Sequence, residues 1–508
     1  MAAGPPEPVE LPDPSDSGNS YWLARSIWAF DEGYAAFHDV DPAFAAFLQD
    51  RLQLAVDALE SLGAYGTYDL ADGVQVPAWL IVDGADASAE AVLGLAAYSA
   101  LVPDDADART ALAQLAEGIA AMAAGDRRTW PYGAVLPWTQ SRSLWHAWAS
   151  QMPAALAEAA QVLGRDDLLA PAVTDSAVFT PTLLTAGGPD NGWLPTPIDR
   201  VQIAYGVDSR LQSLLAVADA SGAEGLRRLA GITASWYFGS NRAGVPVYDP
   251  ATGVTTDGVQ PDGTTNRNAG AESTIHGLLS MLALDAHPDV SALAQAAATV
   301  TLRDGLTGVE AESGTTDGTV LTPDDAWTGE SGWSGGSAVQ LAPGRTASIP
   351  VPAGNGVRSV EPVLLAQPGT PAVSRWTAGR YPLGTLTTRA GDQGITAIPG
   401  VLLPLPLTRP LLPGATTVTV DGRVGTTVVD ALVVRPYLQR LSLAGDDGAA
   451  TELAVSAGRT PLPATVGAAG TTSTVEVFDA TGTLVRSAEL TGRGVVAVPA
   501  GGFLVATR

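Results

Sequence analysis

The pattern of apolar residues changes near residue 303, and this change limits the folds open to the chain. Before it, apolar residues recur every three or four positions. In Pro42–Gly63, for example, Phe44, Leu48 and Leu52 share one face behind an initial proline. This spacing predicts amphipathic helices. After it, short apolar runs such as TTVTV, TTVVDALVV and GVVAVPA alternate with Gly, Asp and Pro, which predicts β-strands and turns. We therefore expect a helical part followed by a β part.

About ten helices are predicted in the first part, many of them joined by short turns. They cover residues 21–38, 42–63, 85–100, 106–124, 141–164, 166–186, 199–221, 224–239, 270–285 and 290–302. Consecutive helices with tight connections pack as antiparallel neighbours, so we expect five or six helical hairpins. Arranged in a ring, these hairpins form an all-α (α/α) toroid whose loops surround a cleft at one end.

The β part is divided by a break at 440–449, RLSLAGDDGA. A chain of 508 residues is too long for one ordinary domain. We predict a flexible Pro/Asp/Ser-rich arm (1–19), the toroid (20–303), a β-sandwich (304–438) and a small β domain (439–508). The predicted fold class is multidomain, with an all-α toroid followed by an all-β sandwich and a small C-terminal β module.

Charge and composition argue against several classes of partner. The net charge is −26 and the pI is near 4.3, whereas binding to nucleic acid or an anionic membrane needs a basic face. Cysteine is absent, so disulfides and thiolate metal sites are excluded. No apolar run reaches membrane-spanning length, and the start MAAGPPEPVELPDPSDSGNS does not resemble a signal peptide. We expect a cytoplasmic protein, or a secreted one whose signal peptide has been removed.

The strongest lead to function is a polar loop of roughly 28 residues that follows the aromatic segment at Trp236. A loop of this length inside a compact helical region is uncommon unless it is functional or disordered. It and the next helix start carry polar groups of the kinds that bind and cleave sugars: Arg242, Tyr248, Asp249, Asp257, Asp262, Asn266, Arg267, Asn268, Glu272 and His276.

Three carboxylates are the predicted catalytic residues, because glycoside cleavage needs a proton donor and a second carboxylate as base or nucleophile. Glu272 falls in the first turn of a helix after NRNAGA, where its other possible role is to stabilise the helix dipole. Asp208 lies in the helical run QIAYGVDSRLQSLL, where a structural pair with Arg210 is the alternative. Asp86 lies in DGADASAE just before a helix, which it could instead cap.

Aromatic and polar residues of the helical part are the predicted substrate-binding groups, because flat aromatic faces stack on pyranose rings. The predicted set is Trp130, Trp138, His146, Asp190, Asn191, Trp193, Tyr205, Tyr248, Arg267, Asn268 and His276. Each has a structural alternative; the turn GGPDNGW, for example, favours Asp and Asn for backbone reasons alone. No two histidines have the spacing of a zinc protease, so no catalytic metal or cofactor is predicted.

The first β segment resembles known carbohydrate-binding modules. The pieces GVEAESG (308–314), GWSGGSAVQLAPGRTASIPVPA (332–353) and VVDALVVRP (428–436) are similar to modules of families 6 and 35, which are jelly-roll sandwiches. The resemblance implies that Glu310, Glu312 and Asp430 hold a structural Ca²⁺, and carboxylate oxygens suit this ion. The alternative is a purely structural cap on the helical part.

The helical part resembles the α/α-toroid carbohydrate-active enzymes, or six-hairpin glycosidases. The likeness lies in the hairpins, in the W-Y-F-G-x-N segment at 236–241, and in the Asn/Gly-rich loop that delivers Glu272 onto a helix. It implies a carbohydrate substrate. The leading hypothesis is a glycoside hydrolase that acts on an oligo- or polysaccharide through two carboxylates in the toroid cleft.

Two other functions stay open. A polysaccharide lyase would use Tyr205 or His146 to take a proton beside a uronate carboxylate. Arg142, Arg200 or Arg267 would neutralise that carboxylate. The third hypothesis is a non-catalytic glycan-binding protein. The products distinguish the three, because a lyase creates a carbon–carbon double bond, a hydrolase creates only new reducing ends, and a binding protein does neither.

Overall fold

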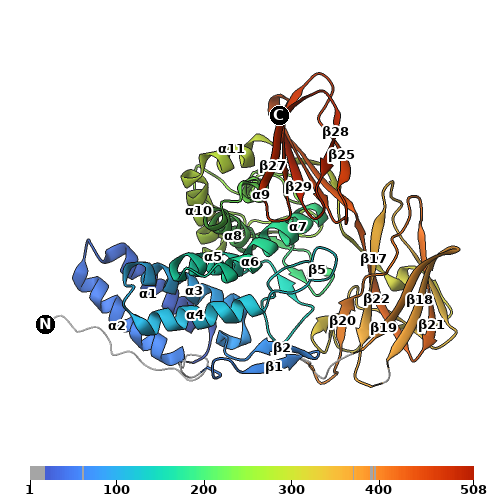
Figure 1. The fold of residues 1–508 in the computed structure, drawn as a ribbon, viewed down its shortest axis with the longest axis horizontal. Helices are drawn as coiled ribbons and strands as arrows, with labels where there is room; N and C mark the ends of the chain where they lie inside the picture. The colour runs from blue at the N-terminus through green and yellow to red at the C-terminus, as the bar shows by residue number, and fades with distance from the viewer. Residues whose placement is uncertain (1–17, 60–61, 370, 390–392, 394–395) are drawn as a thin grey trace.

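The computed structural model describes residues 18–59, 62–369, 371–389, 393 and 396–508. The predicted arm at 1–19 lies almost wholly outside these residues. Figure 1 shows the helices of the first part, a β-sandwich beside them, and a C-terminal β part that covers another side of the helices. The predicted order, helical structure followed by antiparallel β structure, is confirmed.

Five helices form an inner layer in which each packs on the next: α1 (Tyr21–Phe37), α3 (Ala85–Leu101), α5 (Met152–Leu163), α8 (Ala204–Ser221) and α10 (Ala271–Ala286). Each is followed by an outer helix that packs on it: α2 (Pro42–Ala58), α4 (Ala106–Ala121), α6 (Asp166–Thr174), α9 (Glu224–Ala234) and α11 (Pro288–Ala296). A π-helical turn links α6 to α7 (Thr180–Ala186). No helix among the described residues is long and apolar enough to cross a membrane.

The row of hairpins is an open arc in the described part of the chain. At one end α10 packs on α8 and α11, and extended packing between α10 and α1 is absent from the described residues. An apolar stripe on α10 accordingly stays exposed: Ile275, Leu278, Leu279 and Leu282. The helical hairpins of the prediction are present, whereas the closed ring stays a prediction.

Two of the predicted helices differ most from the structure. Residues 141–150 form a loop with a short strand, β3 (Trp145–His146), and α5 begins only at Met152, with a proline in its first turn. The predicted helix at 290–302 ends at Ala296, and a strand, β9 (Thr299–Asp304), follows. β9 pairs with β23 (Leu438–Ala444). A tertiary pairing therefore decides the structure of this β-branched segment.

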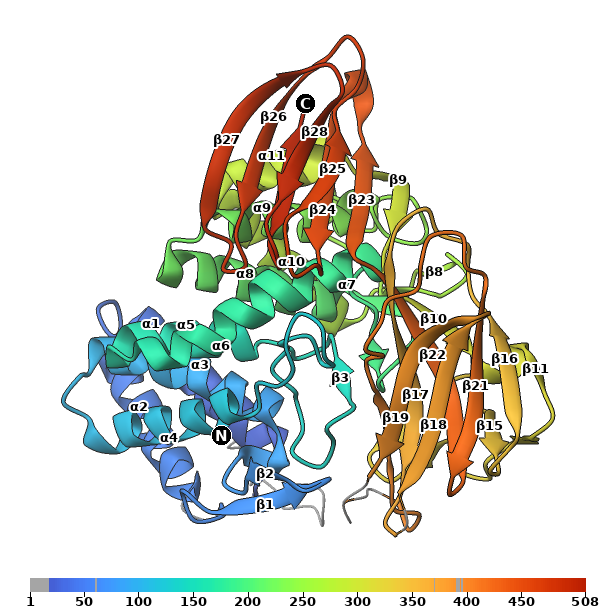
Figure 2. The same cartoon turned by 45° about the vertical axis from the view of Figure 1, so that its right-hand side comes forward.

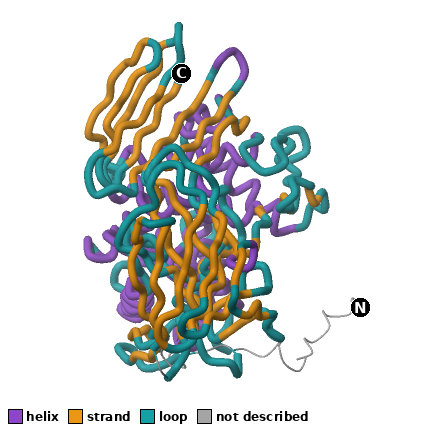
Figure 3. Tube along the Cα trace, turned by 90° about the vertical axis from the view of Figure 1, so that its right-hand side faces the viewer, coloured by secondary structure: helices purple, strands orange, loops and turns teal. Residues whose placement is uncertain are grey.

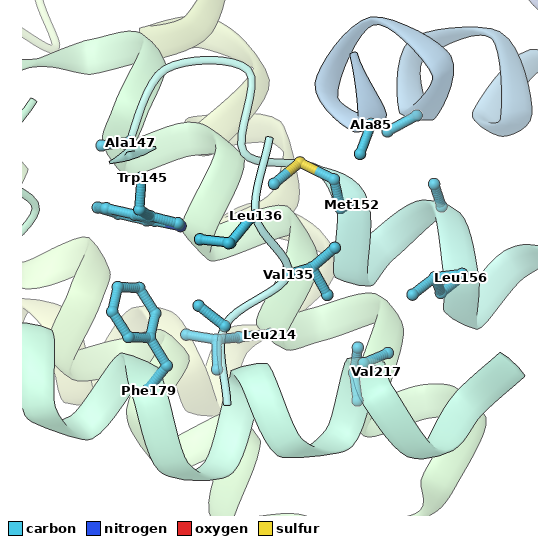
Figure 4. Packing of buried hydrophobic residues seen from close by; sticks show 14 of the residues in the cluster. Ala85, Val135, Leu136, Trp145, Ala147, Met152, Leu156, Phe179, Leu214 and Val217 are labelled. Atoms are coloured by element: carbon cyan, nitrogen blue, oxygen red, sulfur yellow. The ribbon is translucent and has the colours of Figure 1, made fainter. Parts of the chain in front are cut away.

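The helical core forms where the inner helices meet the loop before α5. Figure 4 shows Trp145 from this loop beside Phe179, with Leu214 of α8 close by. The Trp145 and Phe179 rings meet edge to face, with their centroids 4.6 Å apart, and both side chains are fully buried. Trp145 therefore belongs to the core and supplies a large part of its apolar area.

Short strands organise the loops at the N-terminal ends of the inner helices. β3 pairs with β4 (Gly192–Trp193), which pairs with β5 (Pro197–Asp199). β6 (Gln202–Ile203) pairs with β7 (Gly258–Val259), which pairs with β8 (Thr265–Asn266). A hairpin of β1 (Tyr68–Ala71) and β2 (Val74–Pro77) precedes α3. The long polar loop after Trp236 is thereby tied to the segment that enters α8.

The β-sandwich consists of two antiparallel sheets. One contains β12 (Thr319–Leu321), β15 (Ala338–Leu341), β22 (Thr427–Pro436), β17 (Arg358–Ala366) and β20 (Val401–Pro404) in that order, with β10 (Thr307–Glu310) also on β22. The other contains β11 (Thr315–Thr316), β16 (Thr346–Pro350), β21 (Thr417–Val424), β18 (Ala372–Ala378) and β19 (Tyr381–Thr388). Trp376 and Ile349 pack in the core between them. Figure 3 looks onto these strands.

The C-terminal part is a six-stranded antiparallel sheet with a separate two-stranded one. The larger contains β27 (Leu484–Thr491), β26 (Thr472–Phe478), β29 (Phe503–Thr507), β24 (Ala450–Ser456), β23 and β9. The smaller contains β25 (Leu462–Val466) and β28 (Gly494–Val498). Figure 2 shows the larger sheet above α9, where Phe478 lies so close to Gly225 that a Cβ there would clash. The predicted boundary at 303 falls inside β9, and the domain limits stay predictions.

A carboxyl group is buried without a partner between α1 and α3. Asp31 is fully buried against Gly94, and neither of its oxygens has a hydrogen-bond partner among the described residues. Burial, with smaller contributions from Glu32 and Asp105, raises the pKa of Asp31 to about 8. An unfolded chain releases this proton near pH 4. Between these two values the folded state alone holds the proton, so stability falls as the pH rises.

We expect Asp31→Asn to remove this pH dependence. The difference in unfolding free energy between variant and wild type should shift in favour of the variant from pH 5 to pH 8, by on the order of a few kcal/mol. Denaturant unfolding at the two pH values measures this shift. An equal difference at both values would show that Asp31 does not titrate in this range.

Candidate active site

The first turns of the inner helices carry polar side chains in pairs four residues apart. Residues at this spacing lie on one helix face. The pairs are Tyr21 and Arg25 on α1, Asp86 and Glu90 on α3, and Glu272 and His276 on α10; α8 contributes Tyr205 and Asp208. Because consecutive inner helices pack side by side, these first turns meet at one end of the arc, together with the loop that carries His146.

The pairs on α1 and α3 are joined by hydrogen bonds. The Tyr21 hydroxyl donates to Asp86 Oδ2. The Arg25 guanidinium donates from Nε and Nη2 to the two oxygens of Glu90, at 2.9 and 3.3 Å. Burial, reinforced by the charge of Asp86, raises the pKa of Tyr21 above its ordinary value. Tyr21 therefore keeps its proton, and both carboxylates are held in place.

Glu90 connects α3 to α8 and, through stacked rings, to α10. The Tyr205 hydroxyl donates to Glu90 Oε1 at 2.8 Å. Burial and the charge of Glu90 raise the pKa of Tyr205. The Tyr205 ring stacks on His276, with centroids 3.9 Å apart and planes 13° from parallel. The stack fixes the plane of the His276 imidazole.

Asp208 fixes the protonation of His276. His276 Nδ1 lies 2.8 Å from Asp208 Oδ2; because a carboxylate accepts, Nδ1 carries the hydrogen. The other Asp208 oxygen accepts from Ser280 Oγ at 2.8 Å and from Gln212 Nε2 at 3.1 Å, and Asp208 is fully buried. His276 Nε2 has no hydrogen-bond partner among the described residues, and the side chain is 14% exposed. Nε2 is thus available as a base.

The His146 ring lies against the Asp86 carboxylate. Its Nδ1 lies 2.6 Å from the main-chain oxygen of Trp148, and its Nε2 lies 3.2 Å from Asp86 Oδ2. A carbonyl oxygen can only accept, so Nδ1 is protonated. Nε2 and the carboxylate are close enough to form an ion pair when the ring is protonated. The Trp148 ring covers His146, with centroids 3.5 Å apart. This pair can therefore donate a proton.

Five predicted site residues thus meet in one network: Asp86, His146, Tyr205, Asp208 and His276. Their roles differ from the prediction, however. Asp208 is buried beneath His276 and cannot itself touch a substrate, so it orients the histidine. Glu272, the first choice as catalytic carboxylate, is exposed one turn before His276 and makes no hydrogen bond or ion pair with another described residue.

Several predicted binding residues are engaged in structural contacts. Trp130 and Trp193 stack on each other at 5.9 Å and are only 7% and 1% exposed, so protein covers their faces, and stacking on a sugar is not open to them. Asp190 is buried and paired with Arg242 at 2.5 Å, and Asn191 donates to Asp199 at 2.6 Å. These contacts stabilise the loops at this end of the arc.

The other predicted binding residues lie on those loops, outside the network. Trp138 is half-buried and bridges to Gly84 just before α3. Tyr248 is half-buried and packs near Trp236. Arg267 and Asn268 are exposed before α10. Nothing in their contacts assigns them a role.

Tyr21, Arg25 and Trp148 are members of the network that the prediction did not include as site residues. Tyr21 and Arg25 repeat, at the start of the first helix, the four-residue spacing of Asp86 and Glu90. This repeated spacing is the sequence signal that points to Tyr21 and Arg25. For Trp148, only the fold of the loop shows that its ring lies on His146.

The predicted calcium ligands lie near one another in the sandwich. Ser334 N donates to Asp430 at 3.0 Å, and Ser334 Oγ donates to Glu310 at 2.7 Å. Burial, and then the charge of Glu310, raise the pKa of Asp430 well above its usual range. The Oε2 atoms of Glu310 and Glu312 are buried without a partner among the described residues. Even so, no group of three His, Cys, Asp or Glu side chains in this part of the chain converges closely enough to hold a metal ion.

No family model matches the chain, and no curated protein matches it in sequence. Among solved structures, cellobiose 2-epimerase from Bacillus thermoamylovorans resembles 52% of this chain over 71% of its own, at a TM-score of 0.38 and 11% identity. The C-terminal family 6 carbohydrate-binding module of a laminarinase from Zobellia galactanivorans resembles 26% of this chain over 98% of its own, at a TM-score of 0.20 and 15% identity.

An exo-β-1,3-galactanase from Phanerochaete chrysosporium resembles 26% of this chain, at a TM-score of 0.21 and 22% identity. The chain spans only 30% of the length of that enzyme. All three are carbohydrate-active proteins. Scores this low show only a partial likeness of fold.

Proposed function

We propose that this chain is a carbohydrate-active enzyme that abstracts a proton from a sugar carbon next to a carboxyl or carbonyl group. One observation carries the proposal: Asp208 holds His276 in the tautomer that leaves Nε2 free as a base. The resemblance of the sandwich sequence to carbohydrate-binding modules supports a sugar as the substrate. The proposal replaces the two-carboxylate hydrolase as the leading hypothesis.

The state of the buried carboxylates favours this chemistry over hydrolysis. Glu90 is held by Arg25 and Tyr205, and Asp208 by His276, Ser280 and Gln212. Every oxygen of these two carboxylates already has a hydrogen-bond partner, and both side chains are buried away from solvent. The open proton acceptor of the network is an imidazole, and histidine is suited to proton transfer near neutral pH.

The reaction then has two steps. His276 Nε2 takes the proton from the sugar carbon, and the electron pair moves into the adjacent carboxyl or carbonyl group as an enolate. In an elimination, the enolate expels the neighbouring glycosidic oxygen, which takes a proton from the His146–Asp86 pair. In an epimerisation, the His146–Asp86 pair instead delivers its proton to the same carbon on the other face, while His276 keeps the proton it removed. Arg25, whose side chain is 45% exposed, is the network's cation nearest to solvent.

Product analysis tests the proposal. The purified protein is incubated with uronate-containing polysaccharides and with reducing oligosaccharides. An ultraviolet-absorbing unsaturated product identifies elimination, and an epimer with unchanged chain length identifies epimerisation. Cleavage that yields only new reducing ends contradicts the proposal.

Hydrolysis is the second candidate, because the Glu272 carboxylate stays exposed one turn before His276. It would act with the proton held by Asp86 and His146. In our account Glu272→Gln lowers kcat by less than about tenfold, since Glu272 takes no proton. Steady-state kinetics of the folded variant measures this. A loss on the order of a thousandfold would favour hydrolysis through Glu272.

We also propose that Ca²⁺ binds near Ser334 by drawing Glu310, Glu312 and Asp430 closer together than they lie in this structure, since a cation would satisfy the two orphaned oxygens. We expect the melting temperature to fall after treatment with EDTA and to recover with added Ca²⁺. Glu312→Gln should reduce this response. Melting curves that coincide with and without EDTA would contradict the site.

A further inference from the structure

One hairpin of the β-sandwich reaches the candidate active site. β13 (Trp327–Thr328) and β14 (Ser331–Gly332) form it, and Gly329 and Glu330 are its tip. The tip is fixed within the sandwich, because Glu330 N donates to the main-chain oxygen of Gly400 at 3.1 Å and Leu402 N donates to Ser331 Oγ at 2.8 Å. The hairpin therefore moves with the sandwich.

The tip binds the segment that leads into β3. The main-chain oxygen of Glu330 accepts hydrogen bonds from Ser141 Oγ at 2.5 Å and from Ser143 Oγ at 2.9 Å. The Glu330 carboxylate accepts a further one from the main-chain N–H of Arg142. Three consecutive residues are thus held, and the chain reaches His146 only three residues later.

The same hairpin also touches the far side of the small sheet that carries His146. Gly332 N donates to the main-chain oxygen of Leu194 at 3.2 Å, and Gly332 packs against Leu194 and Ile198. Leu194 lies in the turn between β4 and β5, and Ile198 lies in β5. Since His146 pairs with Gly192 of β4, the hairpin contacts the sheet on both sides of the histidine.

The Glu330 carboxyl group is buried at this interface. Glu330 is fully buried, and Oε1 has no partner among the described residues. Burial raises the pKa of Glu330 to about 7, while the bond from Arg142 N lowers it. An apolar side chain would join the two surfaces without the cost of burying a carboxyl group. What Glu330 supplies instead is a hydrogen-bond acceptor placed at one main-chain N–H.

We propose that Glu330 is a positioning residue that holds residues 141–143 and thereby sets the place of His146 relative to Asp86. The effect on catalysis rests on the proposed function, whereas the effect on the loop does not. The β-sandwich is then a working part of the active site, because it supplies the support for the histidine that donates the proton.

Hydrogen–deuterium exchange of the full chain tests whether Glu330 holds residues 141–143. In Glu330→Ala we expect exchange in the segments 141–150 and 192–199 to rise about tenfold or more, because the acceptor for Arg142 N is lost. Glu330→Gln keeps an oxygen at that place and should restore protection. Tyr132→Phe is the matched control: it removes another buried bond of the same interface, from Tyr132 to Glu361 at 2.7 Å, without touching residues 141–143. Unchanged exchange in Glu330→Ala would overturn the proposal.

Steady-state kinetics tests whether Glu330 affects catalysis through His146. We expect Glu330→Ala to lower kcat by about ten- to a hundredfold with a much smaller change in KM, because His146 is misplaced for proton transfer rather than for binding. Glu330→Gln should recover most of kcat, and Tyr132→Phe should keep it. Altered exchange with unaltered kcat would overturn the catalytic role. If the wild type is inactive on every sugar while the exchange pattern is as expected, the positioning role of Glu330 is supported and the proposed function is rejected.

Discussion

Replacing His276 with Gln is expected to lower kcat by on the order of a thousandfold while the fold is retained. Glutamine keeps a donor toward Asp208 but has no imidazole nitrogen to accept a proton. The effect should be on kcat rather than KM, because the Tyr205 stack and the Asp208 contacts hold the residue's surroundings. Steady-state kinetics on the substrate found by product analysis measures it.

His287→Gln is the control for this variant. His287 follows α10, and its Nδ1 bonds the main-chain oxygen of Ala283 at 2.8 Å, away from the network. The control should retain wild-type kcat. Asp208→Asn should resemble the His276 variant, because an amide can donate to Nδ1 and thereby favours the tautomer whose Nε2 is protonated. Equal activity of wild type and His276→Gln would remove His276 as the base.

Replacing Arg210 with Met is expected to lower the free energy of unfolding by about 3–5 kcal/mol. The guanidinium is almost fully buried and bonds Asp175 Oδ1 at 2.5 Å, Ser150 Oγ at 3.0 Å and the main-chain oxygen of Ser150. Without it, Asp175 keeps only the N–H of Val135, at 2.9 Å, as a partner for a buried charge. Because Arg210 lies over Trp145, chemical unfolding followed by tryptophan fluorescence reports the change.

Two further variants separate a buried pair from an exposed one. Arg227→Met breaks an exposed pair, because the Arg227 and Asp219 side chains are 33% and 47% exposed. It should lower the free energy of unfolding by less than about 1 kcal/mol. Asp175→Asn combined with Arg210→Met should recover part of the loss, since the unpaired charge is then gone. Equal losses for the Arg210 and Arg227 variants would mean that burial does not strengthen the pair.

Individual site residues could be predicted because of their place on helices. Asp86 and Asp208 combine a charged group with an apolar helical run, and His276 follows the long polar loop by one turn. The helix pattern was readable because apolar residues recur every three or four positions in segments such as 42–58. The same signal, a polar pair four residues apart at a helix start, could have identified Tyr21 and Arg25.

The roles of these residues could not be predicted, because they depend on contacts between distant segments. Asp208 acts on His276 from 68 positions earlier in the chain, and no local pattern shows that the carboxylate is buried beneath the ring. Trp193 stands in a polar turn, which predicts exposure, yet Trp130 and Phe179 cover it. β9 is a strand because β23 pairs with it across more than a hundred residues.

The central claim, that the site moves a proton to and from a sugar carbon, is tested most directly by mass spectrometry of products formed in D₂O. Uronate-containing polysaccharides and reducing oligosaccharides serve as substrates for wild type and His276→Gln. We predict that the wild type forms either an unsaturated product or an epimer with deuterium bound to carbon, and that the variant forms neither. Saturated products from both proteins, with the elements of water added and no deuterium on carbon, would contradict the account.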